Sequence, residues 1–305
     1  MMAGSQPKVA FIGIGAMGYP MARRLAERGF PLLVHDADAQ AAQRLTRFPA
    51  VTAATGAGDF ADRDIVITML PDGAAVHECL LGAWGEAVIA DVLRPGVTVV
   101  DMSSSKPQGT VELAGRLAER GLRLVDAPVS GGVSRAGQGT LAIIAGGDAS
   151  DLHRVTSVLE ALGSKIFHVG EVGAGHAMKA LNNMLSAAGL AVAVEVLAVG
   201  KRFGLNPQSM LEVLNNSTGR NNSTENKIAQ QVFSRSFSSG FSMRLMVKDL
   251  VTAMDTAHQI GTPVPISAAC LELWKAALRD LGDDLTLDHT AIARYVEERA
   301  GVILE

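Results

Sequence analysis

The spacing of hydrophobic positions divides the chain into two halves. In the first half, short continuous apolar runs alternate with amphipathic stretches such as 19–28 and 150–162, which have helical spacing. The runs are typical of strands that are buried on both faces. They occupy residues 9–12, 31–35, 64–70, 96–101, 122–125, 140–145 and 165–169. This alternation predicts an α/β domain built on a doubly wound parallel sheet.

The strand signals fade after Gly175, and the second half is predicted to be all-α. We expect helices over about 176–204, 206–214, 243–260, 266–280 and 287–300. The polar segments 215–226 and 236–241 are expected to be loops. The sequence therefore predicts two domains, a sheet domain over 1–172 and an all-helical domain over 173–305 that begins with a long interdomain helix.

Composition narrows the class of protein. At 305 residues the length suits about two domains, and 27 basic against 31 acidic residues give no charge signal for nucleic acid or an anionic membrane. Cys79 and Cys270 lie far apart and are expected to be reduced core residues, with no metal site. No signal peptide is visible, and the apolar run 184–194 is too short to span a bilayer. We expect a soluble, cytoplasmic protein.

A glycine-rich turn directly follows the first predicted strand. It reads Gly13-Ile14-Gly15-Ala16-Met17-Gly18 and opens a helix. Such a turn alone is weak evidence, because glycine turns are common. Asp36, however, ends the next strand eighteen residues after Gly18, as in a dinucleotide-binding βαβ unit.

Each residue type in this unit has a physical reason. Gly13 allows the tight turn, Gly15 lets backbone N–H groups approach a pyrophosphate, and Gly18 lets the helix pack on the strand. Asp36 is expected to accept hydrogen bonds from the adenosine ribose. A 2′-phosphate would be repelled there, and no arginine follows Asp36 directly. The sequence therefore favours NAD over NADP as the cofactor.

Further turns end the neighbouring strands and are expected to gather around the same crevice. They are Leu70-Pro71, Ser103-Ser104 and Ser130-Gly131-Gly132. The first two are candidate cofactor contacts. The third offers a hydroxyl and unhindered N–H groups, which suit a small carboxylate, although an ordinary glycine turn would look the same.

Lys179 is the candidate acid/base. Hydride transfer at a carbon that bears oxygen needs one group to move a proton, and neither an evident His–Asp arrangement nor a Tyr-x-x-x-Lys motif is present. Lys179 enters an otherwise apolar helix, and Asn183 lies on the same face to orient the substrate. Burial and a second cation, for which Lys248 is the candidate, would lower the pKa of such an amine. The alternative is a solvated surface lysine.

Several of these motifs together resemble the β-hydroxyacid dehydrogenase family, which includes 3-hydroxyisobutyrate dehydrogenase and is related to 6-phosphogluconate dehydrogenase. The resemblance rests on Phe11 to Gly18, Asp126 to Gly132, Gly139-Thr140-Leu141, Gly175-x-x-x-Lys179-x-x-Asn182-Asn183 and Lys248-Asp249-Leu250. It implies a Rossmann-type domain with an all-helical second domain, and a homodimer or homotetramer. It also implies that Lys179 is the catalytic acid/base and that Asn183 orients the substrate. Ser130, Gly131 and Gly132 would hold the substrate carboxylate, with Lys248 beside cofactor and substrate.

The expected function is NAD-dependent oxidation of a short β-hydroxy acid to a semialdehyde or keto acid. Two alternatives remain, an imine or semialdehyde reductase of the same fold and a non-catalytic NAD-binding sensor. The chain departs from many relatives at Arg135, which edges the carboxylate turn or faces solvent. Asn182 stands where decarboxylating 6-phosphogluconate enzymes resemble one another in having His. The Arg220-Asn221-Asn222 segment either contacts a hydroxylated substrate or is a solvated connection.

Overall fold

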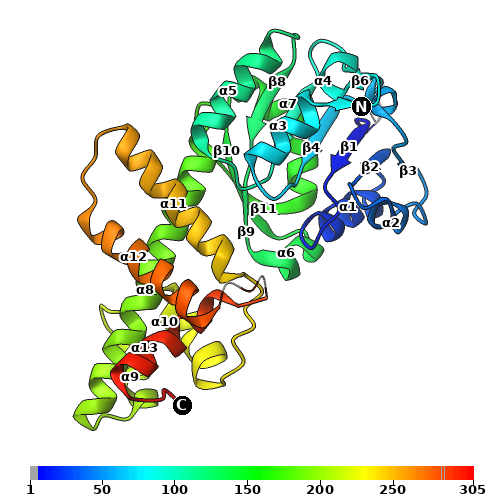
Figure 1. Cartoon of the computed structure of the whole chain (residues 1–305). Helices are drawn as coiled ribbons and strands as arrows, with labels where there is room; N and C mark the ends of the chain where they lie inside the picture. The colour runs from blue at the N-terminus through cyan, green and yellow to red at the C-terminus, as the bar shows by residue number, and fades with distance from the viewer. Residues whose placement is uncertain (1–5, 283, 285) are drawn as a thin grey trace. The chain divides into compact units, whose positions relative to one another are not determined.

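The computed structural model describes residues 6–282, 284 and 286–305. Contacts divide the chain into two compact units, Met1–Lys179 and Ala180–Glu305. In Figure 1 the first unit runs from blue to green and carries the sheet, and the second runs from green to red and is helical. The boundary falls within helix α8 (Ala174–Phe203), which begins in the first unit and continues into the second.

The first unit contains a nine-stranded sheet in the order β11-β10-β8-β7-β4-β1-β2-β3, with β9 paired to β10. The strands from β3 to β8 are parallel, whereas β10 is antiparallel to β8 and parallel to β11. Their bounds are β1 (Val9–Ile12), β2 (Leu32–His35), β3 (Val51–Ala53), β4 (Ile65–Thr68), β7 (Thr98–Asp101), β8 (Arg123–Asp126), β9 (Val129–Ser130), β10 (Leu141–Gly146) and β11 (Gly163–Gly170). The predicted doubly wound sheet is present, with two reversed strands at one end. A separate hairpin joins β5 (Ala83–Trp84) and β6 (Ala87–Val88).

Helices cover both faces of this sheet, so its central strands are buried on both sides. Alternate residues of β1 show the arrangement, because Val9 and Phe11 pack into one apolar cluster while Ala10 and Ile12 pack into another. The helices α1 and α7 contribute to the first cluster, and α3 and α5 to the second. The bounds are α1 (Gly18–Glu27), α2 (Ala39–Gln43), η1 (Ala57–Phe60), α3 (Gly73–Leu81), α4 (Ile89–Val92), α5 (Pro107–Ala118), α6 (Gly132–Gln138) and α7 (Ala149–Leu162).

The second unit is helical, as predicted. After α8 come α9 (Pro207–Asn215), α10 (Asn222–Asn226), η2 (Ile228–Phe233), α11 (Met243–Gln259), α12 (Pro265–Leu281), η3 (His289–Ala291) and α13 (Ile292–Ala300). One apolar cluster, which includes the fully buried Trp274, holds them together. The expectation of a loop over 215–226 was wrong at its end, because Asn221 caps the short helix α10 by accepting hydrogen bonds from the N–H groups of Ser223 and Thr224.

Helix α8 is longer than its apolar run suggested. With 30 residues it is long and apolar enough to cross a membrane by length and composition, which the expectation from residues 184–194 did not allow for. However, 56% of its most apolar window is buried inside the protein. Such burial is usual for a core helix.

Candidate active site

The glycine turn after β1 has the geometry that a bound dinucleotide requires. Gly13 has φ +95°, and a Cβ there would lie 2.3 Å from the Met69 carbonyl oxygen. A Cβ on Gly18 would lie 1.8 Å from the Gly13 carbonyl oxygen, so only glycine allows α1 to start this close to the strand. Gly15, in contrast, is exposed, and a Cβ there would meet nothing within 4 Å. The turn is therefore tight toward the sheet and open above Gly15.

Asp36 is tied to this turn. One carboxylate oxygen accepts a hydrogen bond from the Ile14 N–H at 2.6 Å, and the other accepts one from the Asp38 N–H at 2.8 Å. A carboxylate has about four lone-pair sites, so two remain for ribose hydroxyls. Since Asp36 is only half-buried, those sites can be reached. The turn and Asp36 together fit a dinucleotide.

The other expected cofactor residues differ in how accessible they are. Ala16 is exposed and Met17 is half-buried, whereas Ile14 is buried. Leu70 and Ser104 are half-buried and Pro71 is exposed.

Ser103, like Ile14, is buried. Its hydroxyl accepts the N–H of Leu70 at 2.9 Å. This contact ties the turn after β7 to the turn after β4, so the Ser103 hydroxyl has a structural role.

The candidate carboxylate turn lies on the exposed end of β9. Gly131 and Gly132 have φ values of +139° and +69°, which favour glycine, and both are exposed. Ser130, which pairs with β10, is half-buried. Arg135 lies over the turn, because a Cβ on Gly131 would come within 2.7 Å of its Cδ. The Arg135 stem therefore edges the site.

Lys179 contacts the residue directly before this turn. Its Nζ donates a hydrogen bond of 2.7 Å to the carbonyl oxygen of Val129, the residue before Ser130. The amine is half-buried on α8. The first unit thus brings the candidate acid/base and the candidate carboxylate turn together across fifty residues of sequence. Their catalytic roles stay predictions.

The start of α8 is fixed by Asp126, which ends β8. Its two oxygens accept the Gly173 N–H at 2.7 Å and the His176 N–H at 2.8 Å. These bonds satisfy donors that a helix N-terminus otherwise leaves without partners, and a carboxylate there also suits the helix dipole. Gly175 permits the close approach, since a Cβ there would lie 2.5 Å from the Ile144 carbonyl oxygen. The glycine four residues before Lys179 is therefore needed for packing.

Sequence reasoning missed a buried histidine in this region. His176 has a fully buried side chain between Asp126 and Asp101, at 3.6 and 3.8 Å. Its Nδ1 shares a hydrogen bond with the Thr110 hydroxyl at 2.8 Å, and its Nε2 with the Ser103 carbonyl at 3.1 Å. Because no part of its side chain is exposed, His176 supports the helix and does not contact substrate. The one signal was its position between Gly175 and Lys179.

The other two expected site residues belong to the second unit and share a partner there. Asn183 is buried and donates a hydrogen bond of 2.6 Å to the Asp249 carboxylate. The Nζ of Lys248 lies 3.9 Å from the other oxygen of Asp249. Asp249 therefore orients the Asn183 amide. The expected closeness of Lys248 to Lys179 stays a prediction.

The Arg220-Asn221-Asn222 segment is a structural connection. The Asn221 side chain caps α10, and Arg220 lies 3.7 Å from Glu225 across an exposed pair. Neither contact points to a ligand. The reading of this segment as a helix connection is the one the contacts favour.

Metal and thiol chemistry find no support in the described part of the chain. Residues 6–282, 284 and 286–305 contain no group of three or more His, Cys, Asp or Glu side chains that could hold a metal ion. Cys79 and Cys270 are unpaired. Burial raises the pKa of the Cys79 thiol to about 11 and also raises that of Cys270, so neither is a reactive thiolate at neutral pH.

Two family models match the chain and together cover most of it. Residues 8–170 match the NAD-binding domain of 6-phosphogluconate dehydrogenase. Residues 173–296 match the NAD-binding domain of NADP-dependent 3-hydroxyisobutyrate dehydrogenase. The two matches meet at the start of α8.

Individual proteins match over nearly the whole length. The chain is 34% identical to a 2-(hydroxymethyl)glutarate dehydrogenase of Eubacterium barkeri, over 97% of this chain and 96% of that protein. It is 35% identical to a 3-hydroxyisobutyrate dehydrogenase of Pseudomonas aeruginosa, over 94% and 97%. Among solved structures, the Mycobacterium tuberculosis 3-hydroxyisobutyrate dehydrogenase with L-serine superposes with a TM-score of 0.86 at 32% identity, covering 95% of this chain and 99% of that one.

Proposed function

The chain belongs to the β-hydroxyacid dehydrogenase family that includes 3-hydroxyisobutyrate dehydrogenase, and we propose that it oxidises a short β-hydroxy acid with Lys179 as the acid/base. As a member of this family it is an NAD(P)-dependent oxidoreductase that acts on CH–OH groups. We propose NAD as the preferred cofactor, because the Asp36 carboxylate offers lone pairs to a free ribose and charge repulsion to a 2′-phosphate.

The proposed reaction assigns one task to each part of the site. The Ser130 hydroxyl and the N–H groups of Gly131 and Gly132 bind the substrate carboxylate. Lys179, as a neutral amine, accepts the hydroxyl proton during oxidation and returns it during reduction. Asn183, held by Asp249, orients the substrate oxygen. The bound nicotinamide supplies the hydride acceptor.

One contact carries this proposal, the 2.7 Å hydrogen bond from the Lys179 Nζ to the Val129 carbonyl. It holds the amine beside Val129, the residue that precedes the carboxylate turn, and so supports a reaction in which a substrate carboxylate bound at the turn brings the β-hydroxyl to Lys179. A lysine used only to cover the surface would have no reason to reach the backbone beside this turn.

The relatives suggest a narrower substrate class. The compounds named with them are 3-hydroxyisobutyrate, 2-(hydroxymethyl)glutarate and L-serine. All three carry a CH2OH group on the carbon that bears the carboxylate. We therefore propose a 3-hydroxypropanoate with a substituent at its second carbon, and an aldehyde as the oxidised product.

A substrate panel tests this proposal. The three compounds and the corresponding compounds without the hydroxyl are mixed with the protein and NAD or NADP, and formation of reduced cofactor is followed by its absorbance. At least one hydroxy acid should be oxidised. Silence across the panel, combined with tight NAD binding, would favour the non-catalytic sensor. A cyclic imine mixed with NADH or NADPH tests the imine reductase, because consumption of reduced cofactor with this compound alone would favour that activity.

Replacing Lys179 with methionine separates proton transfer from binding. We expect kcat to fall by about 10² or more, because an acid/base contributes that much, while the dissociation constant for NADH stays within about twofold. The exposed Lys165 on β11 is the matched control, and its methionine variant should keep full activity. A Lys179→Met protein with near wild-type kcat would contradict the assignment.

We also propose that a second copy of the chain covers one face of α8. Within the second unit, six exposed large apolar side chains follow heptad-like spacing along this helix: Leu181, Leu185, Val192, Val196, Val199 and Phe203. Leu185 is 76% exposed and Phe203 is 84% exposed. Light scattering should show a dimer or tetramer for the wild type. The double variant Val199→Glu and Phe203→Glu should be monomeric. A wild-type monomer would contradict self-association.

A further inference from the structure

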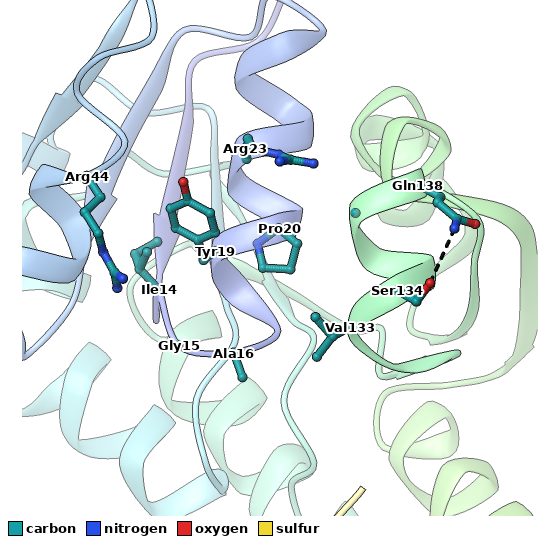
Figure 2. A pocket seen from close by; sticks show the side chains of 11 residues that line it. Ile14, Gly15, Ala16, Tyr19, Pro20, Arg23, Arg44, Val133, Ser134 and Gln138 are labelled. Carbon is teal, nitrogen blue, oxygen red and sulfur yellow. Dashed lines mark hydrogen bonds between the residues drawn. The ribbon is translucent and has the colours of Figure 1, made fainter. Parts of the chain in front are cut away.

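A pocket of about 690 Å³ lies beside the glycine turn, wholly within the first unit. Figure 2 shows Ile14, Gly15 and Ala16 at its base, with Arg44 on the side of Tyr19 and with α6 on the opposite side. The charged residues that line it are Arg23 and Arg44, and its lining includes no acidic residue from the described part of the chain. A positively charged pocket that shares Gly15 and Ala16 with the cofactor turn suits an anion.

Arg44 is held in place without being neutralised. Its guanidinium carbon lies 5.4 Å from the centre of the Tyr19 ring, a cation–π contact that fixes the side chain and leaves its N–H donors for other partners. Tyr19 is itself held by Arg47, which donates a hydrogen bond of 3.0 Å to the Tyr19 hydroxyl. Among the described residues no carboxylate lies within ion-pair distance of Arg44, whereas Arg23 lies 3.4 Å from Glu27. Arg44 is the cation left to meet a ligand.

We infer that Arg44 binds a phosphate group of the dinucleotide. The planar guanidinium matches phosphate oxygens, and the pocket it lines is continuous with the turn on which the pyrophosphate is expected. Arg44 stands eight residues after Asp36, whereas the preference for NAD was argued from the residues directly after Asp36. The inference rests on the dinucleotide binding of the proposed function and is independent of Lys179 and of the substrate.

The experiment measures dissociation constants for NADH and NADPH by cofactor fluorescence, with no turnover required. Arg44→Gln should weaken binding about tenfold, as expected for loss of a charge-assisted hydrogen bond. Arg47→Gln is the matched control, since Arg47 is also an exposed arginine that contacts Tyr19 but does not line the pocket. Its constants should stay within about twofold of the wild type, because it has no contact with the phosphate.

The two cofactors distinguish the two phosphates. An equal loss for NADH and NADPH assigns Arg44 to the pyrophosphate, and a loss confined to NADPH assigns it to the 2′-phosphate. Either result supports the inference. Unchanged dissociation constants for both cofactors would overturn the inference. The role of Arg44 would then be limited to its packing against Tyr19. A wild-type protein that binds neither dinucleotide is a separate outcome, because it would also remove the proposed function.

Discussion

Each unit contains a buried cluster built around an aspartate and a histidine, and the two clusters serve different ends. The Asp126 cluster of the first unit comprises Asp126, Asp101, His176, Thr110 and Ser103. The Asp288 cluster of the second unit comprises Asp288, His289, Ser239 and Thr290. The first holds the start of the helix that carries Lys179. The second fastens the loop at 239–241 to the residues of η3.

The clusters also differ in how completely their histidines are bonded. Both ring nitrogens of His176 have partners, namely Thr110 and Ser103. In His289 the Nδ1 contacts the Ser239 hydroxyl and the Phe241 carbonyl, but the buried Nε2 has no hydrogen-bond partner among the residues that the structure describes. Burial, aided by the positive charge of Lys227, lowers the pKa of His289 to about 4. Similar residues therefore give a support whose histidine is fully hydrogen-bonded in one unit, and in the other a support whose histidine has one nitrogen unbonded and a lowered pKa.

The difference teaches that a buried Asp–His pair is not by itself a catalytic signal. A catalytic pair must expose one member to substrate, and the His176 side chain is fully buried while that of His289 is nearly so. What links the Asp126 cluster to chemistry is that it bonds the backbone of the helix bearing Lys179. The cluster therefore contributes by positioning this helix. Its effect on kcat and its effect on the free energy of unfolding can be measured separately in mutants.

The largest effect is expected for Asp126→Ala. The change leaves the buried Gly173 and His176 N–H groups without acceptors, and two such losses cost about 4 kcal/mol of the free energy of unfolding. Because the helix start then shifts, kcat should also fall by about tenfold or more. Urea unfolding and steady-state kinetics measure the two effects.

Asp148→Ala is the control for this change. Asp148 also caps a helix, since its carboxylate accepts the Ser150 N–H at the start of α7, but it is exposed and α7 is not the helix that carries Lys179. Its loss should cost less stability and leave kcat unchanged. If Asp126→Ala lost stability but kept kcat, the cluster would be structural only, and the contrast between the two units would disappear.

The next effect is a pH dependence that belongs to the Asp288 cluster. The unfolded chain has a His289 pKa near 6.5, and the folded chain one of about 4. Between these values the unfolded state binds a proton that the folded state does not. The free energy of unfolding therefore falls as the pH is lowered through this window, by about 3 kcal/mol for the full shift, and the loss levels off below pH 4.

His289→Gln should remove this contribution. Unfolding measured from pH 7 to 4 gives the slope for the wild type and the variant, and the difference between them should shrink as the pH falls. His153→Gln, at an exposed histidine of α7, should follow the wild-type slope. Parallel slopes for wild type and His289→Gln would show that His289 is protonated in the folded state, contrary to its burial.

The two clusters also mark where sequence reasoning ends. The glycine turn, Asp36 and the sheet could be predicted because strand, turn and helix follow one another within about thirty residues. The partners of His176 lie 50 to 73 residues away, so no local pattern reveals them. Arg44 was missed because only the fold brings it, from just beyond the end of α2, to the pocket that the glycine turn also lines. The short helix α10 was missed because its segment is polar and resembles a loop. The helix begins with a capping box, in which Asn221 and Thr224 bond each other reciprocally.

The segment from Gly175 to Lys179 contains residues that are needed for two different reasons. The place of Lys179 in a helix after a nucleotide domain led to the prediction of an acid/base, whereas the reason for Gly175 appears only in the structure, where a Cβ would meet the Ile144 carbonyl. The motif thus combines a packing requirement with a chemical one, and only the second could be argued from the sequence.

The smallest effect is expected for Ser239→Ala, which removes one hydroxyl from the Asp288 cluster. This hydroxyl lies 2.9 and 3.0 Å from the two Asp288 oxygens and 3.0 Å from the His289 Nδ1. Since Asp288 retains the Gly240 and Thr290 N–H groups, the loss should be about 1 kcal/mol in the free energy of unfolding, with kcat unchanged.

Ser238→Ala is the neighbouring control, because Ser238 uses its backbone N–H to contact Gln231 and its side chain is exposed. It should change stability by less than about 0.5 kcal/mol. A fall in kcat with Ser239→Ala but not with Ser238→Ala would mean that the Asp288 cluster also positions catalytic groups. The division of labour between the two units would then have to be redrawn, since both clusters would support the chemistry.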